Sequence, residues 1–183
     1  MSDFKLYSIE NAPADSQPLL EGAKKEMGMV PNLFGVMAES PQLLEAYQTM
    51  NGIFMNTSLS TEEKNVVWLS INVEHNCHYC VPAHTGIAKQ MGVSDEVIEA
   101  LRDEKPLPDD KLEALRTFTL TVVRERGHVS GGDVDAFLKA GFTKRNVMDV
   151  IVGVSQKVMS NYLNHIAETP VDDAFGDFAW EKK

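Results

Sequence analysis

From residue 40 onward, the apolar side chains recur at intervals of three and four residues, the spacing that places them on one face of an α-helix. Leu44, Tyr47 and Phe54 illustrate this pattern in the first such segment. Residues that favour helix starts stand before the segments: Ser40 with Pro41 after it, Ser60 with Glu63 three residues on, Ser94, and Thr143 before a segment that reaches about Ile166. No segment alternates polar and apolar residues as a β-strand does. The pattern therefore predicts an all-α protein.

The second half of this pattern resembles the first at an offset of 49 residues (141 − 92). Gly92-Val93-Ser94 matches Gly141-Phe142-Thr143, and each half reads as a long helix, a break, a short helix, a glycine and a capped helix. A true two-fold repeat and a chance succession of capped helices both explain this match. Residues 103–110, with two prolines among charged residues, form the best candidate linker. At 183 residues, we expect a single helical domain over 1–183.

Composition narrows the class of protein. Hydrophobic residues make up 43% and charged residues 24% of the chain, as is typical of a globular fold. The net charge is −10, which argues against binding to nucleic acid or to an anionic membrane surface, because both need clustered cations. No apolar run is long enough to span a membrane, and the first residues lack the features of a secretory signal, so we expect a cytoplasmic protein.

The two cysteines, Cys77 and Cys80, carry the strongest chemical signal. Their spacing in a protein without other cysteines points to redox or metal chemistry rather than to a disulfide scaffold. Pro82 has no backbone N–H and fits best in the first turn of a helix, which places Cys80 in that turn and Cys77 just ahead of it. The helix dipole favours a thiolate there. His84 follows Cys80 by four residues, so the two share a helix face and His84 can act as a base.

This arrangement predicts a thiol-based reaction with hydroperoxides. One thiolate attacks the O–O bond and becomes a sulfenic acid, the second thiol condenses with it to a disulfide, and an external thiol or dithiol reduces the pair. His84 serves as the base for the thiol and as the acid for the departing alkoxide. The reaction requires no bound cofactor and no metal.

The segment CHYCVPAHT (77–85) resembles the alkylhydroperoxidase D / carboxymuconolactone decarboxylase family, in its peroxidase-related branch. Residues 30–34 and 161–165 are also similar to that branch, and the resemblance covers about 19–173, leaving 174–183 as a C-terminal arm. It implies an all-helical fold, assembly into trimers or hexamers, and thiol peroxidase or disulfide reductase activity. It also implies that Cys80 is the nucleophile, Cys77 its partner and His84 part of a proton relay.

Two positions depart from the family pattern. Where better-studied members have a glutamate, twelve residues before the first cysteine, this chain has Asn65, which cannot exchange protons. Where they have a histidine before the second cysteine, it has Tyr79, which can donate a hydrogen bond to a thiolate or to a bound oxygen. Glu74 and His78 are the candidates to replace the missing relay group.

Other interpretations stay open at this point. Cys77, Cys80 and His84, with His75 or His78 and a distant His128 or His165, offer ligands for a zinc ion in a non-enzymatic helical module. The family name also suggests a lactone decarboxylase, although such an activity does not depend on a C-x-x-C pair. Asn161, Asn164 and His165 favour a polar face or a hydrogen-bond cluster between subunits. The apolar helix faces predict a homo-oligomer, whether dimer, trimer or hexamer.

Overall fold

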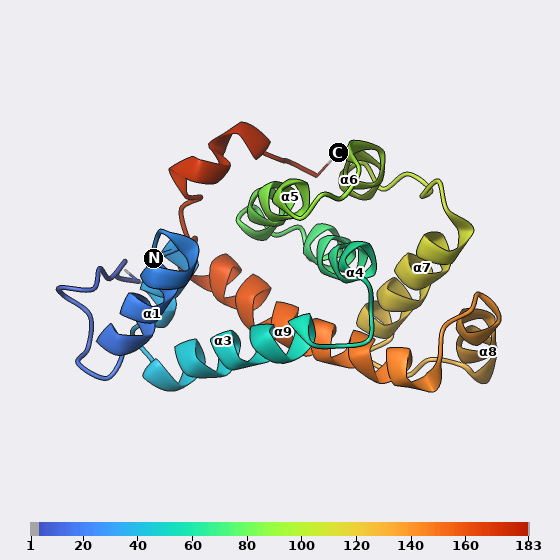
Figure 1. Ribbon diagram of the computed structural model, residues 1–183, viewed down its shortest axis with the longest axis horizontal. Helices are drawn as coiled ribbons and strands as arrows, with labels where there is room; N and C mark the ends of the chain where they lie inside the picture. Colours follow the sequence, from blue (N-terminus) through green and yellow to red (C-terminus); the bar gives the residue numbers. More distant parts are fainter. Residues whose placement is uncertain (1–3, 183) are drawn as a thin grey trace.

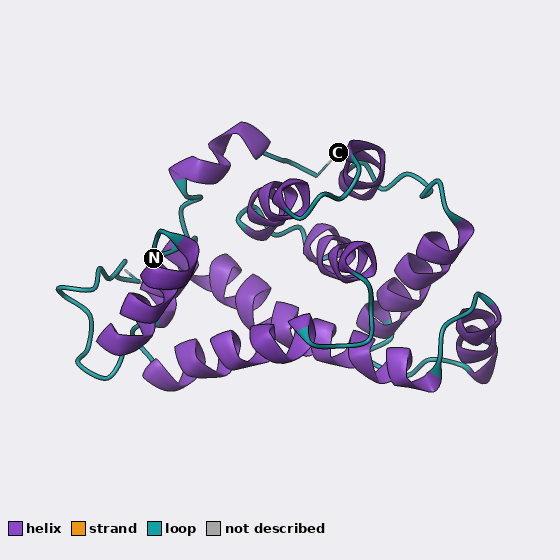
Figure 2. Ribbon diagram, in the orientation of Figure 1, coloured by secondary structure: helices purple, strands orange, loops and turns teal. Residues whose placement is uncertain are grey.

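The computed structural model describes residues 4–182, and every regular element in that range is helical (Figure 2). The elements are α1 (Gln17–Met27), α2 (Asn32–Met37), α3 (Pro41–Met55), α4 (Thr61–Glu74), α5 (Cys80–Gln90), α6 (Asp95–Arg102), α7 (Asp110–Arg124), α8 (Gly131–Lys139), α9 (Lys144–Ala167) and the 3₁₀ helix η1 (Asp173–Phe178). The all-α prediction is confirmed. No helix within residues 4–182 combines the length and apolar character needed to cross a membrane.

Polar side chains begin the helices at the residues that the sequence predicted. The Ser60 side chain accepts the backbone N–H of Glu63, and the Glu63 carboxylate accepts the N–H of Ser60 at 2.7 Å, which completes a capping box at α4. Side chains that cap the other predicted starts are Ser40, Ser94 and Thr143. Gly92 and Gly141 have φ angles of 80° and 97°, left-handed values that let the chain leave α5 and α8.

Helix α4 lies at the centre of the molecule and has no solvent-exposed face. Eleven of its 14 residues are buried, and it packs against α5, α6, α7 and α9 (Figure 1). A helix that is enclosed on all sides needs apolar residues around its whole circumference, which explains the run of Val66, Val67, Trp68 and Leu69. Because α4 is fixed by four neighbours, the turn that follows it is held in a defined position.

The longest helix, α9, crosses α3 and α4 at very short range. An ideal Cβ on Gly153 would lie 2.8 Å from the Phe54 ring and 2.8 Å from Val67. Those separations are too short for a side-chain carbon, so glycine permits the three helices to meet at this point. The crossing sets the position of the rest of α9 relative to α4.

The buried apolar side chains form two clusters. The first joins α4 with α6, α7, α8 and the start of α9, and includes the stacked rings of Phe118, Phe137 and Phe142. The second joins α1, α2 and α3 with the start of α5 and with η1, and includes Cys77 and Cys80. The cysteines therefore lie in apolar surroundings, between the N-terminal helices and the C-terminal segment.

The same order of helices occurs twice. Helix α4 begins at Thr61 and α7 at Asp110, 49 residues apart (110 − 61), and the caps Ser94 and Thr143 keep that offset. The set α4–α5–α6 thus corresponds to α7–α8 and the first turns of α9, in agreement with the internal repeat. Helix α9 continues past residue 151, where the counterpart of α6 would end (102 + 49). This extension has no counterpart in the first half.

Residues 169–180, here called the C-terminal strap, fold back over α5. The Phe175 and Phe178 rings press on this helix at Gly86, where an ideal Cβ would lie 3.0 Å from each ring. The segment that was expected to form an arm outside the core is thus packed along α5 for most of its length.

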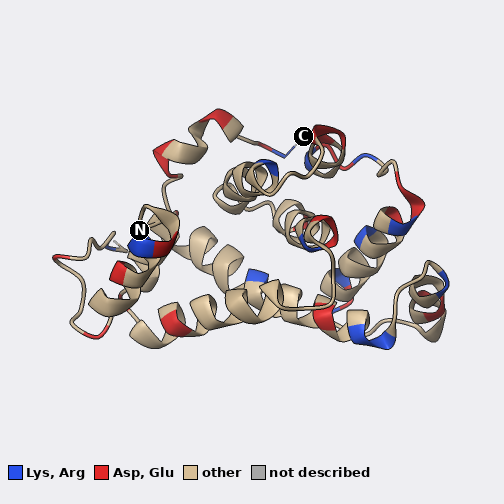
Figure 3. Ribbon diagram, viewed as in Figure 1, with Lys and Arg blue, Asp and Glu red and all other residues tan. Residues whose placement is uncertain are grey.

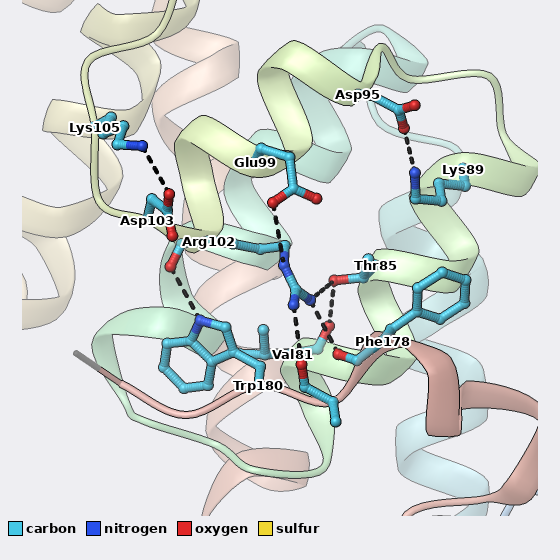
Figure 4. A network of polar contacts seen from close by, with 11 residues as sticks. Val81, Thr85, Lys89, Asp95, Glu99, Arg102, Asp103, Lys105, Phe178 and Trp180 are labelled. Atoms are coloured by element: carbon cyan, nitrogen blue, oxygen red, sulfur yellow. Dashed lines mark hydrogen bonds and ion pairs between the residues drawn. The ribbon is translucent and has the colours of Figure 1, made fainter.

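Arg102, at the end of α6, holds the far end of the strap (Figure 4). Its guanidinium donates to the Thr85 hydroxyl at 2.7 Å and to the main-chain carbonyls of residues 178 and 179, both at 3.1 Å. The Trp180 indole N–H in turn donates to the Arg102 carbonyl at 3.0 Å. Helices α5 and α6 and the strap are tied together by one side chain.

The close crossing at Gly153 makes a testable prediction. Gly153→Ala adds a methyl group where none fits, and we expect it to destabilise the fold by about 1–3 kcal/mol. Gly52→Ala is the matched control, because Gly52 is also helical but an added Cβ there meets nothing within 4 Å. The control should gain about 0.5–1 kcal/mol from the higher helix propensity of alanine. Urea unfolding measures both; equal stability of the two variants would contradict the proposed role of Gly153.

Candidate functional site

Both cysteines lie where the chain turns from α4 into α5. Asn76 adopts a left-handed conformation with φ of 51°, and the Cys77 N–H bonds to the Asn72 carbonyl at 3.0 Å. Helix α5 begins at Cys80, and Pro82 is its third residue. The proline thus occupies the first turn, as its missing N–H predicted, and Cys80 lies at the helix N-terminus.

The two sulfurs are enclosed and contact α9. Cys77 and Cys80 are free thiols with exposed fractions of 0% and 1%. The Asn164 amide Nδ2 lies 3.2 Å from the Cys80 sulfur and 4.0 Å from the Cys77 sulfur. The Cys77 sulfur accepts the backbone N–H of Cys80 at 3.3 Å. One amide group on α9 therefore faces the pair, nearer to Cys80.

These surroundings favour ionisation of Cys80 over Cys77. Burial alone raises the pKa of Cys80. The hydrogen bond from Cys77 and the positive charge of Lys157 lower it, as do hydrogen bonds from Asn164 and Ser160, and the resulting pKa of Cys80 is about 6. The hydrogen bond to Cys80, together with burial and the negative charge of Cys80, raises the pKa of Cys77 far above its ordinary value. At neutral pH, Cys80 is the thiolate and Cys77 the thiol.

His84 lies on α5 one turn after Cys80 but contacts a different group. Its Nε2 is 2.7 Å from the Nζ of Lys157, and its ring centroid lies 5.0 Å from that of Trp68. Among residues 4–182, no hydrogen bond joins His84 to either sulfur. Burial, followed by the charge of Lys157, holds the pKa of His84 well below 6.5, so the imidazole is neutral at pH 7. The spacing predicted contact with Cys80; in the structure His84 instead contacts Lys157, whose positive charge lowers the pKa of Cys80.

Tyr79 connects the cysteine turn to both ends of the chain. Its hydroxyl donates to the Asp172 carboxylate at 2.6 Å and accepts the Leu33 N–H at 3.2 Å. Asp172 also accepts the Asn32 N–H at 2.9 Å, so it caps the start of α2. Burial, and then the hydrogen bond to Asp172, raise the pKa of the Tyr79 hydroxyl. Tyr79 is thus a neutral phenol that ties the turn to α2 and to the strap.

The residues considered as replacements for the relay glutamate interact elsewhere. Glu74 pairs with Arg124 through contacts of 2.8 and 2.7 Å, and this hydrogen bonding lowers the pKa of Glu74. His78 is exposed, and its ring nitrogen lies 3.0 Å from the Thr169 carbonyl. Asn65 itself is buried in α4 and donates to the carbonyl of residue 61 at 2.9 Å.

Sequence reasoning missed the polar face of α9 that lines this site. Lys157, Ser160, Asn161 and Asn164 are all completely buried and lie on one side of the helix, since they are three, four and seven residues apart. We expected Asn161, Asn164 and His165 to form a polar surface or a subunit contact, whereas Asn164 contacts the sulfurs and only His165 is exposed. Their helical spacing was visible in the sequence; the element opposite them was not.

The ligands of the zinc interpretation do not assemble. Among residues 4–182, no three His, Cys, Asp or Glu side chains lie close enough together to hold a metal ion. His84 turns to Lys157, and His78 turns to the strap. The zinc-bound module therefore has no geometric support in this part of the chain.

Comparison with known proteins finds a family model that matches the segment around this site. Residues 41–107, which include both cysteines and His84, match the model of the carboxymuconolactone decarboxylase family. The similarity to this family is thus confined to the segment that carries the cysteines. No curated protein is detectably similar to the chain in sequence.

Several solved structures share the fold of this chain. A peroxidase-related protein from Ralstonia eutropha with an alkylhydroperoxidase AhpD core matches with a TM-score of 0.83 and 21% identity over 94% of this chain and 93% of its own. A peroxidase-related protein from Silicibacter sp. matches at 0.80 and 21%, over 94% and 92%. The debrominase Bmp8, as a cysteine-to-alanine variant with 2,3,4-tribromopyrrole, matches at 0.77 and 15%, over 96% and 94%.

The strap is bonded to the cysteine turn through His78 and Tyr79, and we expect its release to expose the cysteines. We expect Asp172→Ala to cost about 1–3 kcal/mol, because it leaves the Tyr79 hydroxyl and the Asn32 N–H without their charged acceptor. Local opening then becomes more frequent, and iodoacetamide should modify the cysteines faster. Asp173→Ala, at the exposed neighbouring residue, is the control and should change neither property. If both variants react at the wild-type rate, the strap does not limit access.

The pKa of Cys80 also predicts how stability depends on pH. Its folded-state pKa of about 6 lies below the ordinary 9.0, so the unfolded chain binds the extra proton between these values. The resulting stabilisation is fully present above pH 9 and is lost as the pH falls towards 6. We expect the difference in unfolding free energy between wild type and Cys80→Ser to grow from pH 6 to pH 9, because titrating groups that do not interact with Cys80 cancel in that difference. A difference that stays constant over this range would show that Cys80 is not ionised in the folded protein.

Proposed function

We propose that this protein is a thiol-dependent peroxidase and disulfide oxidoreductase, which reduces small hydroperoxides through Cys80 and Cys77. The observation that carries the proposal is the contact of the Cys80 sulfur with Asn164, at 3.2 Å, beside a second thiol and a buried lysine. A thiolate with a neighbouring thiol is what peroxide reduction with disulfide formation requires. The peroxidase-related proteins with the same fold support this reaction class.

The proposed cycle starts at Cys80. Its thiolate attacks one oxygen of the hydroperoxide; an S–O bond forms, the O–O bond breaks, and the departing alkoxide takes a proton from the Lys157–His84 pair. Cys77 then attacks the sulfenic acid, which forms the disulfide and releases water. An external thiol or dithiol reduces the disulfide and returns one proton to Cys77 and one to the Lys157–His84 pair. His84 acts in this cycle through Lys157, which it contacts at 2.7 Å. The proposal involves no metal and no cofactor.

The setting of this reaction follows from the same chemistry. A reducing cytoplasm keeps the pair as thiols between turnovers, in keeping with the absence of other cysteines. We also propose a homo-oligomer, because α9 presents Met148, Ile151 and Ile166 with exposed fractions of 66%, 51% and 64%. An apolar surface of this kind is usual where identical subunits meet.

Two other reactions are compatible with the family and the fold. A lactone decarboxylation of the kind that the family name describes does not require two sulfurs, so it should survive in Cys77→Ser. A debrominase shares the fold, although at only 15% identity. Incubating the reduced protein with an organobromide instead of a peroxide, and measuring whether the organobromide is consumed, distinguishes debromination from the proposed reaction.

The cysteine variants test the proposed function. One equivalent of hydroperoxide should remove two thiols from wild type, and a dithiol should restore them. Cys77→Ser should accumulate a sulfenic acid at Cys80, because the resolving thiol is missing, while Cys80→Ser should consume peroxide at least about tenfold more slowly, since a thiol of ordinary pKa is only a few per cent ionised at pH 7. Mass spectrometry and thiol titration measure these outcomes. Glu74→Gln is the control, because that carboxylate is paired with Arg124 and should not affect the rate.

A sulfenic acid that forms only at Cys77 would reverse the assigned order of the two cysteines. Thiols that survive an excess of peroxide in the wild-type protein would rule out the proposed function.

A further inference from the structure

Lys157 is an unusual residue in this fold. It is completely buried, and it is the only Lys, Arg, Asp or Glu between residues 150 and 167, a half of α9 that Figure 3 shows mostly uncharged. Within residues 4–182, no carboxylate lies within ion-pair distance of its ammonium group. A buried charge without a counter-charge is strongly unfavourable, so an anion near this side chain would stabilise the ammonium form.

The groups that do contact Lys157 are neutral. Its Nζ lies 2.7 Å from Nε2 of His84 and 3.5 Å from the Tyr47 hydroxyl, with the Tyr47 ring centroid at 5.9 Å. Neither group is a carboxylate: a histidine is neutral or cationic, and the Tyr47 oxygen accepts from the ammonium as a hydroxyl. The counter-charge must therefore come from another side chain.

The geometry of α9 indicates which side chain this is. Lys157 lies seven residues before Asn164, two helical turns along the same face, with Ser160 between them. Asn164 touches the Cys80 sulfur, and the charge of Lys157 acts on that same sulfur. The other titratable groups that face this region are Cys77, Tyr79, His84 and Tyr47.

We propose that the Lys157 ammonium and the Cys80 thiolate are each other's buried counter-charge, and that Lys157 takes the place of the missing relay glutamate by holding the proton that Cys80 gives up. This inference rests on the proposed function only for the later fate of that proton. His84 is a positioning residue: its Nε2 accepts a hydrogen bond from the ammonium, so the neutral imidazole carries its own proton on Nδ1.

The charge pair also explains why proton transfer accompanies oxidation. When Cys80 becomes a sulfenic acid, its negative charge leaves with the alkoxide, and Lys157 would remain as an isolated buried cation. Transfer of one ammonium proton to the alkoxide gives the alcohol and a neutral amine, so the site stays uncharged. Reduction by a dithiol returns that proton to Lys157 as Cys80 becomes a thiolate again.

The test measures the ionisation of Cys80 without any peroxide. Thiolate absorbance near 240 nm is followed against pH in the reduced protein, and the transition is assigned to Cys80 by its absence from Cys80→Ser. Wild type should titrate near pH 6. Lys157→Met keeps the length of the side chain but not its charge, and should raise the midpoint by at least about one unit, a tenfold loss of thiolate below the midpoint. Lys64→Met removes another buried lysine, on α4, and should leave the midpoint unchanged.

An unshifted midpoint in folded Lys157→Met overturns the proposal, and so does a wild-type midpoint at the ordinary thiol value. If Lys157→Met fails to fold, the double variant Lys157→Met/Cys80→Ser provides the test. Removing one charge of a buried pair leaves the other unpaired and destabilises the fold, whereas removing both charges should restore folding. A double variant that folds supports the pair, and one that stays unfolded overturns it. Peroxide turnover is measured separately. If Lys157→Met shifts the Cys80 midpoint but the wild-type protein does not turn over peroxide, only the proposed function is refuted. If the wild-type protein turns over peroxide but Lys157→Met leaves the Cys80 midpoint unchanged, only the Lys157–Cys80 charge pair is refuted.

Discussion

The structure depends on keeping one anionic sulfur inside an apolar cluster. Cys80 is 1% exposed and lies among the side chains of α1, α2, α3 and η1, where an unaccompanied charge would cost several kcal/mol. Each polar group around it therefore has a defined task. The Cys77 thiol supplies a hydrogen bond, Asn164 supplies an amide hydrogen, and Lys157 supplies positive charge. This requirement also explains why α9 carries a buried polar face.

The internal repeat shows where these groups come from. The first half of the molecule supplies the cysteine turn, held by the enclosed helix α4. In the second half, the helices that correspond to it are structural, and the residues opposite the sulfurs lie on α9 after residue 151, beyond the end of the repeat. The cysteine site thus forms between one repeat and an extension of the other. Gly153 stands at the beginning of that extension and sets how closely it approaches α4.

Much of this fold could be predicted from the sequence, and the failures have physical causes. Helices from residue 41 to residue 167 follow from their periodicity and from capping residues that act locally. Helices α1 and α2 did not stand out, because α2 has only six residues and its first N–H group, that of Asn32, is bound by Asp172, 140 positions away. The position of Pro82 was predictable because a missing N–H is a local property. Lys157 was not, since lysine is ordinarily exposed and only tertiary packing shows what surrounds it.

The strap places the last part of the site late in the chain. Tyr79 and Asp172, whose hydrogen bond joins the cysteine turn to its cover, are 93 residues apart. At ~5–20 residues per second, a ribosome needs roughly 5–19 s to add that stretch. During this interval, a nascent chain displays both thiols with neither the strap nor the face of α9 in place. Biosynthesis therefore passes through a stage in which the fold does not yet shield the cysteines from an oxidant.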